Sequence, residues 1–265
     1  MRNSDFLQHE AGVRALPLGQ LRNFAVVGPL HGTTTLDRFA TLPERADMTT
    51  RLDIISDPIC PWCYIGKSRL DRALEARADH PFEIDWRPFQ LNPDMPPEGM
   101  DRRAYLEAKF GGKEGAIRVY SQIEQMAQSN GLDIDFAAMK RTPNTIDAHR
   151  LIRWSRIEGR QSLVVNQLFH RYFKLGQDIS DHEVLVDVAD TVSMDAAVIA
   201  RLLEGDADVA DIREEDANYR EMGVTGVPTF IIGGKHVVVG AQEPEMWMQV
   251  IDEINTLNSQ NVEQS

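Results

Sequence analysis

The sequence predicts an α/β fold in which a helical insertion separates a βαβ unit from a ββα unit. Two short β-type runs, residues 51–56 and 82–89, flank a helical pattern. Helical spacing then dominates from residue 102 to about residue 219. Two further apolar runs meet at Gly233-Gly234, before a last helical pattern over residues 243–257. An α/β core with one large helical insertion accounts for this order of elements.

The βαβ unit is predicted from a change in the period of the apolar residues. Residues 51–56 (RLDIIS) alternate weakly and are rich in Ile, which indicates a strand. Apolar residues then recur at helical spacing until His80-Pro81 ends the helix, and residues 82–89 alternate again. Because a helix that joins two neighbouring strands gives a right-handed parallel crossover, the two β-type runs are expected to pair in parallel.

The helical insertion is expected at about residues 100–220, within one domain that spans residues 48–265. Several apolar helix faces follow one another in this region, and glycines and prolines separate them. Ser180-Asp-His-Glu183 indicates a capping box that opens one of these helices. After the final helix, the last eight residues are expected to form a polar tail.

Residues 1–47 are expected to be an N-terminal extension, either disordered or upstream of a true start at Met48. Regular patterning begins only after Met48. The apolar patch at residues 24–30 is broken by Gly28 and Pro29 and follows acidic residues, so it is a poor match to a secretory signal. We therefore expect the protein to be cytoplasmic.

The charge of the chain excludes some classes of partner. Its formal net charge is −13, which would repel the phosphates of a nucleic acid. There is no polybasic stretch for an anionic membrane surface and no apolar run long enough to span a bilayer. Neither nucleic acid nor membrane is therefore expected as a partner, and the oligomeric state stays open.

Cys60 and Cys63 are the only two cysteines of the chain, and they are two residues apart. A structural disulfide between them would close a very short loop and gain little stability, and it would be unusual in a reducing compartment. A zinc site needs about four ligands, and the sequence holds no second Cys-x-x-Cys and no suitably spaced histidines. No metal site is therefore expected, and a redox pair is the remaining interpretation.

The position of the pair assigns different roles to the two thiols. Cys60 stands where the first strand gives way to the helix, and Pro61 suits a first helical position. A helix N-terminus favours the thiolate, which is the nucleophile. Cys60 is thus expected to attack and Cys63, a turn into the helix and more buried, to resolve. A Cys-x-x-Cys before a helix in a βαβ unit indicates a thioredoxin-like core. With the helical patterning of residues 102–219, the expected fold is this core with an inserted all-helical subdomain.

Three nearby residues carry further expectations. Asp57 is expected either to cap the helix or to modulate the proton of the thiol, and the cap is the favoured alternative. Trp62, between the cysteines, is expected to be exposed and to touch a substrate peptide. His149 lies beside an apolar helix face and is expected to be structural rather than part of a substrate site.

Five motifs in order give the chain a family resemblance. They are SDPICPWCYIGK, WRPFQLNPDMP, NTIDAHRLIRWSRIEGRQ, LFHRYFKLGQDISDHEVL and GVTGVPTFIIGGKHVVVGAQ. Together they resemble the DsbA-like branch of the thioredoxin superfamily, and within it the FrnE-type thiol oxidoreductases. The resemblance covers residues 51–257 and implies that Pro228 is a cis proline against the redox pair. It also implies that Trp62, Val227 and Pro228 line a substrate groove. Some FrnE-type proteins carry a second cysteine pair, which this chain lacks.

The sequence thus predicts a thiol–disulfide oxidoreductase that acts on protein or small-molecule thiols and disulfides through Cys60 and Cys63. No tightly bound cofactor is expected, and glutathione is a candidate redox partner. Whether the protein acts as an oxidase, isomerase or reductase stays open. One alternative is a glutathione-dependent enzyme similar to 2-hydroxychromene-2-carboxylate isomerase and kappa-class glutathione transferases, which usually place a serine where Cys60 stands. A second alternative is a non-catalytic peptide-binding module of thioredoxin fold.

Overall fold

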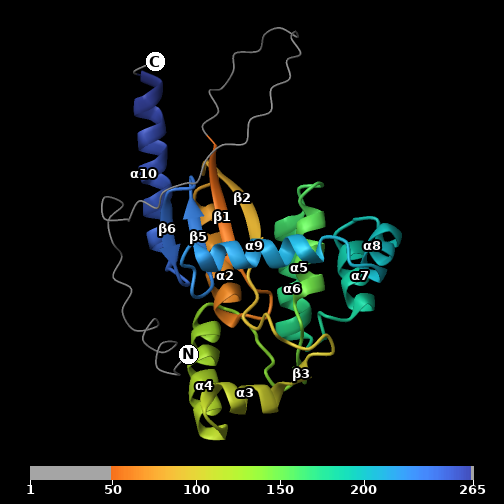
Figure 1. The fold of residues 1–265 in the computed structure, drawn as a ribbon. Helices are drawn as coiled ribbons and strands as arrows, with labels where there is room; N and C mark the ends of the chain where they lie inside the picture. Colours follow the sequence, from red (N-terminus) through yellow and green to blue (C-terminus); the bar gives the residue numbers. More distant parts are fainter. Residues whose placement is uncertain (1–48, 264–265) are drawn as a thin grey trace.

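The computed structural model describes residues 49–263, so the extension predicted for residues 1–47 lies outside the described residues. Figure 1 shows a central sheet with helices around it. The four strands have the order β2-β1-β5-β6. They are β1 (Thr50–Ser56), β2 (Phe82–Pro88), β5 (Thr229–Ile232) and β6 (His236–Val239). β1 and β2 pair in parallel, whereas β5 is antiparallel to both β1 and β6, which confirms the predicted βαβ and ββα units.

The central position of β1 explains its weak alternation. β1 lies between β2 and β5, and all of its residues from Leu52 to Ser56 are buried. Leu52 and Ile54 belong to the main apolar core, whereas Ile55 points into a smaller cluster with Phe89. A strand that is covered on both faces has no solvent side, so its apolar residues need not alternate with polar ones.

Two helices of the core pack against each other beside the sheet. They are α2 (Pro61–Ala76) and α10 (Pro244–Glu263). Trp247 of α10 is fully buried, and its ring centroid lies 4.7 Å from that of Phe230 of β5. The predicted end of the last helix at residue 257 was wrong, because α10 continues through the polar residues to Glu263. Neither glycine nor proline occurs at residues 258–263 to end the helix.

The insertion lies between β2 and β5 and is helical, as predicted. Its helices are α3 (Arg102–Phe110), α4 (Lys113–Ser129), α5 (Ile146–Ser155), α6 (Gln161–Phe169) with the π-helical turn η2 (His170–Lys174), α7 (His182–Thr191), α8 (Ala196–Glu204) and α9 (Val209–Glu221). It also contains a small antiparallel pair that the sequence did not predict, β3 (Met100–Asp101) with β4 (Arg141–Thr142). Strands of two residues are too short to show a period in the sequence.

The capping box predicted at Ser180–Glu183 was wrong by one residue. Asp181, rather than Ser180, precedes α7, and its carboxylate accepts a hydrogen bond from the Glu183 N–H at 2.9 Å. Asp is as good a residue at this position as Ser, so the sequence pattern alone could not choose between them.

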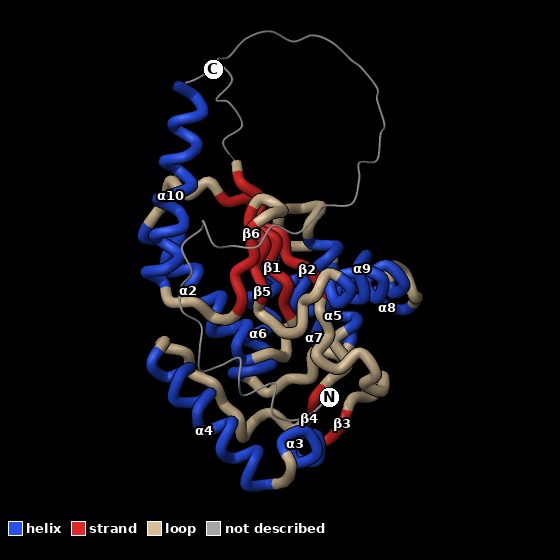
Figure 2. The backbone as a smooth tube through the Cα atoms, turned by 60° about the vertical axis from the view of Figure 1, so that its left-hand side comes forward, coloured by secondary structure: helices blue, strands red, loops and turns tan. Residues whose placement is uncertain are grey.

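The helices of the insertion lie close to the start of α2, which carries Cys60 and Cys63. In Figures 1 and 2, α3 and α4 project beyond the end of the sheet at which α2 begins. Helix α4 packs on α2, while α5, α6 and α9 contact β2. The start of α2, which carries the two cysteines, therefore lies between the core and the insertion. Within the described part of the chain, no helix combines the length and the apolar character that a membrane span requires.

A buried arginine holds the insertion together. Arg150 of α5 donates from Nε to the Ala207 carbonyl at 2.7 Å, and from Nη2 to the carbonyls of Leu202 at 2.6 Å and Gly205 at 2.8 Å. Its Nη1 donates to Asp147 Oδ1 at 2.6 Å. The last carbonyls of a helix have no partner within that helix, so the guanidinium satisfies the end of α8 and the turn that leads to α9.

Replacing Arg150 with Leu should destabilise the protein by about 3 kcal/mol, because buried carbonyls would lose a charged donor. For a chain of this size the melting temperature should fall by roughly 6–12 °C in a calorimetric scan. Arg201, exposed on α8, provides the control, and its replacement with Leu should change stability by less than about 0.5 kcal/mol. Equal losses in the two variants would contradict the role given to Arg150.

Candidate active site

Cys60 precedes the first turn of α2. Its backbone is extended, at φ −85° and ψ 117°, and Pro61 is the first helical residue. The Cys60 carbonyl accepts hydrogen bonds from the N–H groups of Cys63 at 3.1 Å and Tyr64 at 3.2 Å. The Cys60 side chain makes no capping hydrogen bond, and the first turn of α2 holds no acidic residue. The helix N-terminus can therefore act on the Cys60 sulfur, where it favours negative charge.

The two thiols are free and differ less in exposure than the sequence predicts. Cys60 is 3% exposed and Cys63 is 1% exposed. Burial raises the pKa of the Cys63 thiol well above its usual range, and the adjacent Cys60 thiol adds to the rise, while a hydrogen bond with Ser56 opposes it. In this state Cys63 keeps its proton, which fits a thiol that reacts second rather than first.

The segment before β5 lies against Cys60. The peptide bond between Val227 and Pro228 is cis, which confirms what the resemblance implies. The Cys60 Sγ–H donates to the Val227 carbonyl at 3.6 Å. On the neighbouring turn of α2, a Cβ at Gly66 would lie 3.0 Å from Pro228 Cγ, so only a glycine lets the proline approach this closely without a shift. The resemblance implies that Cys60, Val227 and Pro228 lie together, and the structure places the Val227 carbonyl, next to Pro228 in the chain, against the Cys60 sulfur.

Trp62 is not exposed as expected. The side chain is half-buried, packs against the main core, and lines a pocket together with Cys60. Its Nε1 has no hydrogen-bond partner among the described residues. Helices of the insertion pack on this side of α2. The residues next to Trp62 in the sequence could not predict this packing, because the insertion is far from Trp62 in the chain.

Asp57 does not cap α2, so the favoured alternative was wrong. Its side chain is fully buried and accepts hydrogen bonds from the N–H groups of Ile59 at 3.2 Å and Leu91 at 2.6 Å. Burial raises the pKa of Asp57 to about 7, against the lowering effect of these two hydrogen bonds. The Asp57 backbone lowers the pKa of the Cys63 thiol, against the larger effect of burial. The other alternative, a carboxyl group that affects the proton of a thiol, is compatible with this geometry.

His149 lies in the interior of α5 and does not line the pocket at Cys60. Burial lowers its pKa to about 4, so the ring is neutral near pH 7. This placement agrees with the structural role expected from the sequence. Among residues 49–263, no three His, Cys, Asp or Glu side chains come together in a group that could hold a metal ion.

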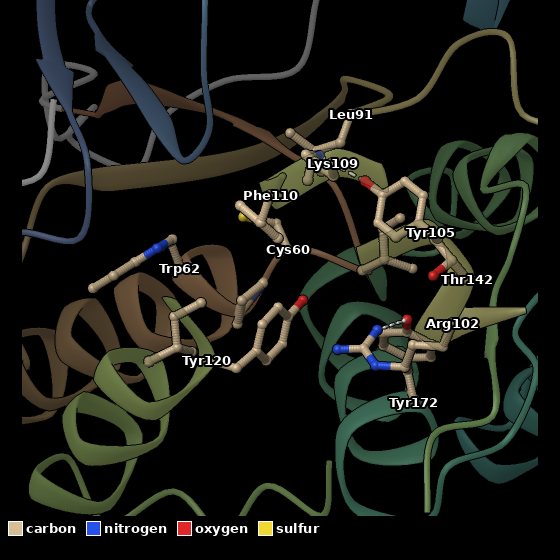
Figure 3. Close-up of a pocket in the computed structure, with 13 residues that line it drawn as sticks. Cys60, Trp62, Leu91, Arg102, Tyr105, Lys109, Phe110, Tyr120, Thr142 and Tyr172 are labelled. Atoms are coloured by element: carbon tan, nitrogen blue, oxygen red, sulfur yellow. Dashed lines mark hydrogen bonds between the residues drawn. The ribbon is translucent and has the colours of Figure 1, made fainter. Parts of the chain in front are cut away.

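A pocket opens beside Cys60 between the core and the insertion (Figure 3). The insertion supplies much of its wall: Arg102, Tyr105, Lys109, Phe110, Tyr120, Ile123, Thr142 and Tyr172. Ile59, Pro61, Trp62 and Leu91 complete the lining on the side of the core. The sequence analysis missed the contribution of the insertion. One usable indication was present, since Arg102, Tyr105 and Lys109 share the spacing of one helix face.

The four-stranded sheet, the Cys-x-x-Cys at the start of α2 and the cis proline beside it define a thioredoxin-like protein. The chain belongs to the family of the DSBA-like thioredoxin domain, whose model matches residues 51–252. The insertion of helices between β2 and β5 is therefore part of a family domain and not a separate addition.

Known relatives agree with this assignment. The chain is similar to the uncharacterized protein YwbO of Bacillus subtilis (strain 168), with 26% identity over 208 residues that cover 78% of this chain and 98% of YwbO. It is similar to the crystal structure of the probable DsbA oxidoreductase SCO1869 from Streptomyces coelicolor, with 29% identity, a TM-score of 0.69, and coverage of 77% and 89% of the two chains. A 2-hydroxychromene-2-carboxylate isomerase shares the fold at 17% identity and a TM-score of 0.58, over 81% and 99% of the two chains.

Because the pKa of Asp57 is raised in the folded protein, the free energy of unfolding should depend on pH. Its pKa is about 7 in the folded protein and 3.8 in its ordinary state, so the folded protein holds a proton over a range in which the unfolded chain has lost it. The stability that this group contributes is complete below about pH 4 and is lost as the pH rises through 7. Between pH 4 and pH 8, the free energy of unfolding of the wild type should fall by a few kcal/mol relative to Asp57→Asn.

Urea unfolding across that pH range measures this difference. Asp79→Asn is the control, because Asp79 is exposed, and its free energy of unfolding should change with pH in the same way as that of the wild type. Parallel curves for the wild type and Asp57→Asn would show that Asp57 titrates as an ordinary carboxyl group.

Proposed function

We propose that the protein catalyses thiol–disulfide exchange through Cys60 and Cys63. The observation that carries this proposal is the position of the Cys60 sulfur. It lies at an uncapped helix N-terminus, 3.6 Å from the Val227 carbonyl before the cis proline, and at the edge of a pocket. A thiolate there is stabilised by the helix and has a space in which a substrate sulfur can approach.

The proposed reaction has two exchange steps. The Cys60 thiolate attacks one sulfur of a substrate disulfide, a bond forms between Cys60 and that sulfur, and the other substrate sulfur leaves as a thiolate. The Cys63 thiolate then attacks the Cys60 sulfur, which forms the Cys60–Cys63 disulfide and releases the second substrate thiol. The substrate gains two electrons and the protein loses two; the reverse sequence oxidises a dithiol.

The second step requires Cys63 to lose its proton. We assign Asp57 as the acceptor, because it lies three residues before Cys60 in the turn that leads into α2 and its pKa of about 7 suits proton exchange near neutral pH. A buried carboxylate that takes up this proton becomes neutral, which is its favoured state in such surroundings.

The cysteine content and the residue at position 60 also support proposals for the cellular compartment and the redox partners. A chain with two cysteines suits a reducing compartment, and we propose a cytoplasmic protein that exchanges with protein or small-molecule thiols and disulfides. Glutathione is proposed as a redox partner and not as a bound cofactor. The presence of a cysteine at position 60, where the glutathione-dependent isomerases usually have a serine, favours exchange over isomerase chemistry.

Trapping of the mixed disulfide tests the assignment of the two thiols. Cys63→Ser should accumulate a covalent adduct with a substrate disulfide such as oxidised glutathione, because no second thiol is present to resolve it. Cys60→Ser should form far less adduct, since the raised pKa of the Cys63 thiol keeps it protonated. Intact-protein mass spectrometry measures both, and the double variant serves as the control. A Cys63→Ser protein without adduct, or a Cys60→Ser protein that retains full activity, would contradict the proposal and favour a peptide-binding module.

A further inference from the structure

Arg102 stands apart from the other buried cations of the protein. Four lysines and arginines are buried within residues 49–263: Lys67, Arg69, Arg102 and Arg150. Three of them have a carboxylate partner, at 2.6 Å from Lys67, 2.7 Å from Arg69 and 2.6 Å from Arg150. Arg102 is 6% exposed, and no carboxylate of the described residues forms an ion pair with it. A buried charge without a counter-charge is costly, so its surroundings need an explanation.

Phenol groups surround the Arg102 guanidinium. Its Nη1 donates to the Tyr172 hydroxyl at 2.8 Å, and its central carbon lies 5.0 Å from the ring centroid of Tyr120 and 5.8 Å from that of Tyr172. These contacts fix the position of the guanidinium, but neutral phenols do not balance its charge. A guanidinium carries five N–H donors, so it can still bind a further acceptor.

The guanidinium lines the same pocket as the Cys60 sulfur. Figure 3 shows Arg102 on one side of this space and Cys60 with Trp62 on the other, with Tyr120 between them. Lys109, on the same face of α3, adds a second cation to the wall. Apolar side chains such as Ile59 and Ile123 supply the rest of the lining. The pocket thus combines a nucleophilic sulfur, a short apolar stretch and a cationic wall.

We propose that this pocket binds a small disulfide or thiol that carries a carboxylate, and that Arg102 binds the carboxylate. The inference rests on the proposed exchange reaction and names its class of substrate. Guanidinium and carboxylate form charge-assisted hydrogen bonds in a fixed geometry, which would orient the sulfur–sulfur bond toward Cys60. The Cys60 thiolate then forms a bond to one sulfur, and the other leaves as the thiolate of the second half of the disulfide.

The overall charge of the protein makes this inference easy to test. A net charge of −13 repels an anionic disulfide at long range. Any preference of the protein for an anionic disulfide over a neutral one must therefore come from local cations at the site. Without Arg102 the same pocket should favour the neutral compound.

The experiment compares the reduced protein with two small disulfides, 3,3′-dithiodipropionate, which carries two carboxylates, and bis(2-hydroxyethyl) disulfide, which is neutral. Each second-order rate constant is divided by that of the same disulfide with dithiothreitol, which removes the intrinsic difference in reactivity. The wild type should prefer the dicarboxylate by about tenfold, the scale of one charged hydrogen bond. Arg102→Gln should lose this preference, because the dicarboxylate loses its cationic partner.

Two variants and one competition assay complete the test. Arg103 is the next residue, its side chain is 76% exposed, and Arg103→Gln should keep the wild-type preference. Arg102→Lys should keep part of it, because the charge remains and the fork geometry does not. If Arg102→Gln does not fold, the inference can be tested on the wild type by competition. Glutarate, a dicarboxylate without sulfur, should occupy the carboxylate site and slow the reaction of Cys60 with the neutral disulfide.

Each outcome has a separate meaning. A wild type that reacts with both disulfides without preference, or that keeps its preference in Arg102→Gln, overturns this inference and leaves the proposed exchange in place. The inference is also overturned if Arg102→Gln slows exchange only with a protein disulfide, since the pocket would then serve a polypeptide. A wild type that reacts with neither disulfide refutes the exchange reaction itself.

Discussion

The buried carboxylate of Asp57 holds the active site together. It binds the Ile59 N–H in the turn before Cys60 and the Leu91 N–H in the segment that follows β2. Both N–H groups lie in irregular segments, so without Asp57 they would have no partner of equal strength. The opposite side of that segment is fixed by α9, whose Asp216 accepts from the Gln90 N–H at 2.9 Å. One short segment is thus held by the core on one side and by the insertion on the other.

This connection explains why the insertion belongs to the site. The core alone supplies the two cysteines, the helix N-terminus and the cis proline. The insertion supplies the opposite wall of the pocket, including a cation that the described protein does not neutralise. In the proposed reaction the core supplies the reacting thiols, while α3, α4 and η2 supply the wall of the pocket beside the Cys60 sulfur.

The parts of the site that could be predicted are those with local signals. Cys60, Pro61 and Cys63 mark a helix start by themselves, and Gly233-Gly234 marks a hairpin. The prediction for Asp57 failed because Cys60 is itself the residue before the helix, and Asp57, three residues earlier, turns toward Leu91 instead. The pocket was missed for a different reason. Its wall joins helices far apart in the sequence, and only their tertiary packing brings them to Cys60.

The central claim is that Cys60 and Cys63 form one working redox pair. The most direct measurement is the fraction of free thiols after equilibration of the protein with a series of glutathione ratios, followed by alkylation and mass spectrometry. The account predicts that both thiols disappear together in a single two-electron transition, and its midpoint relative to the cytosolic glutathione pool would give the direction of the reaction. Thiols that never equilibrate with glutathione, or that react independently of each other, would contradict it.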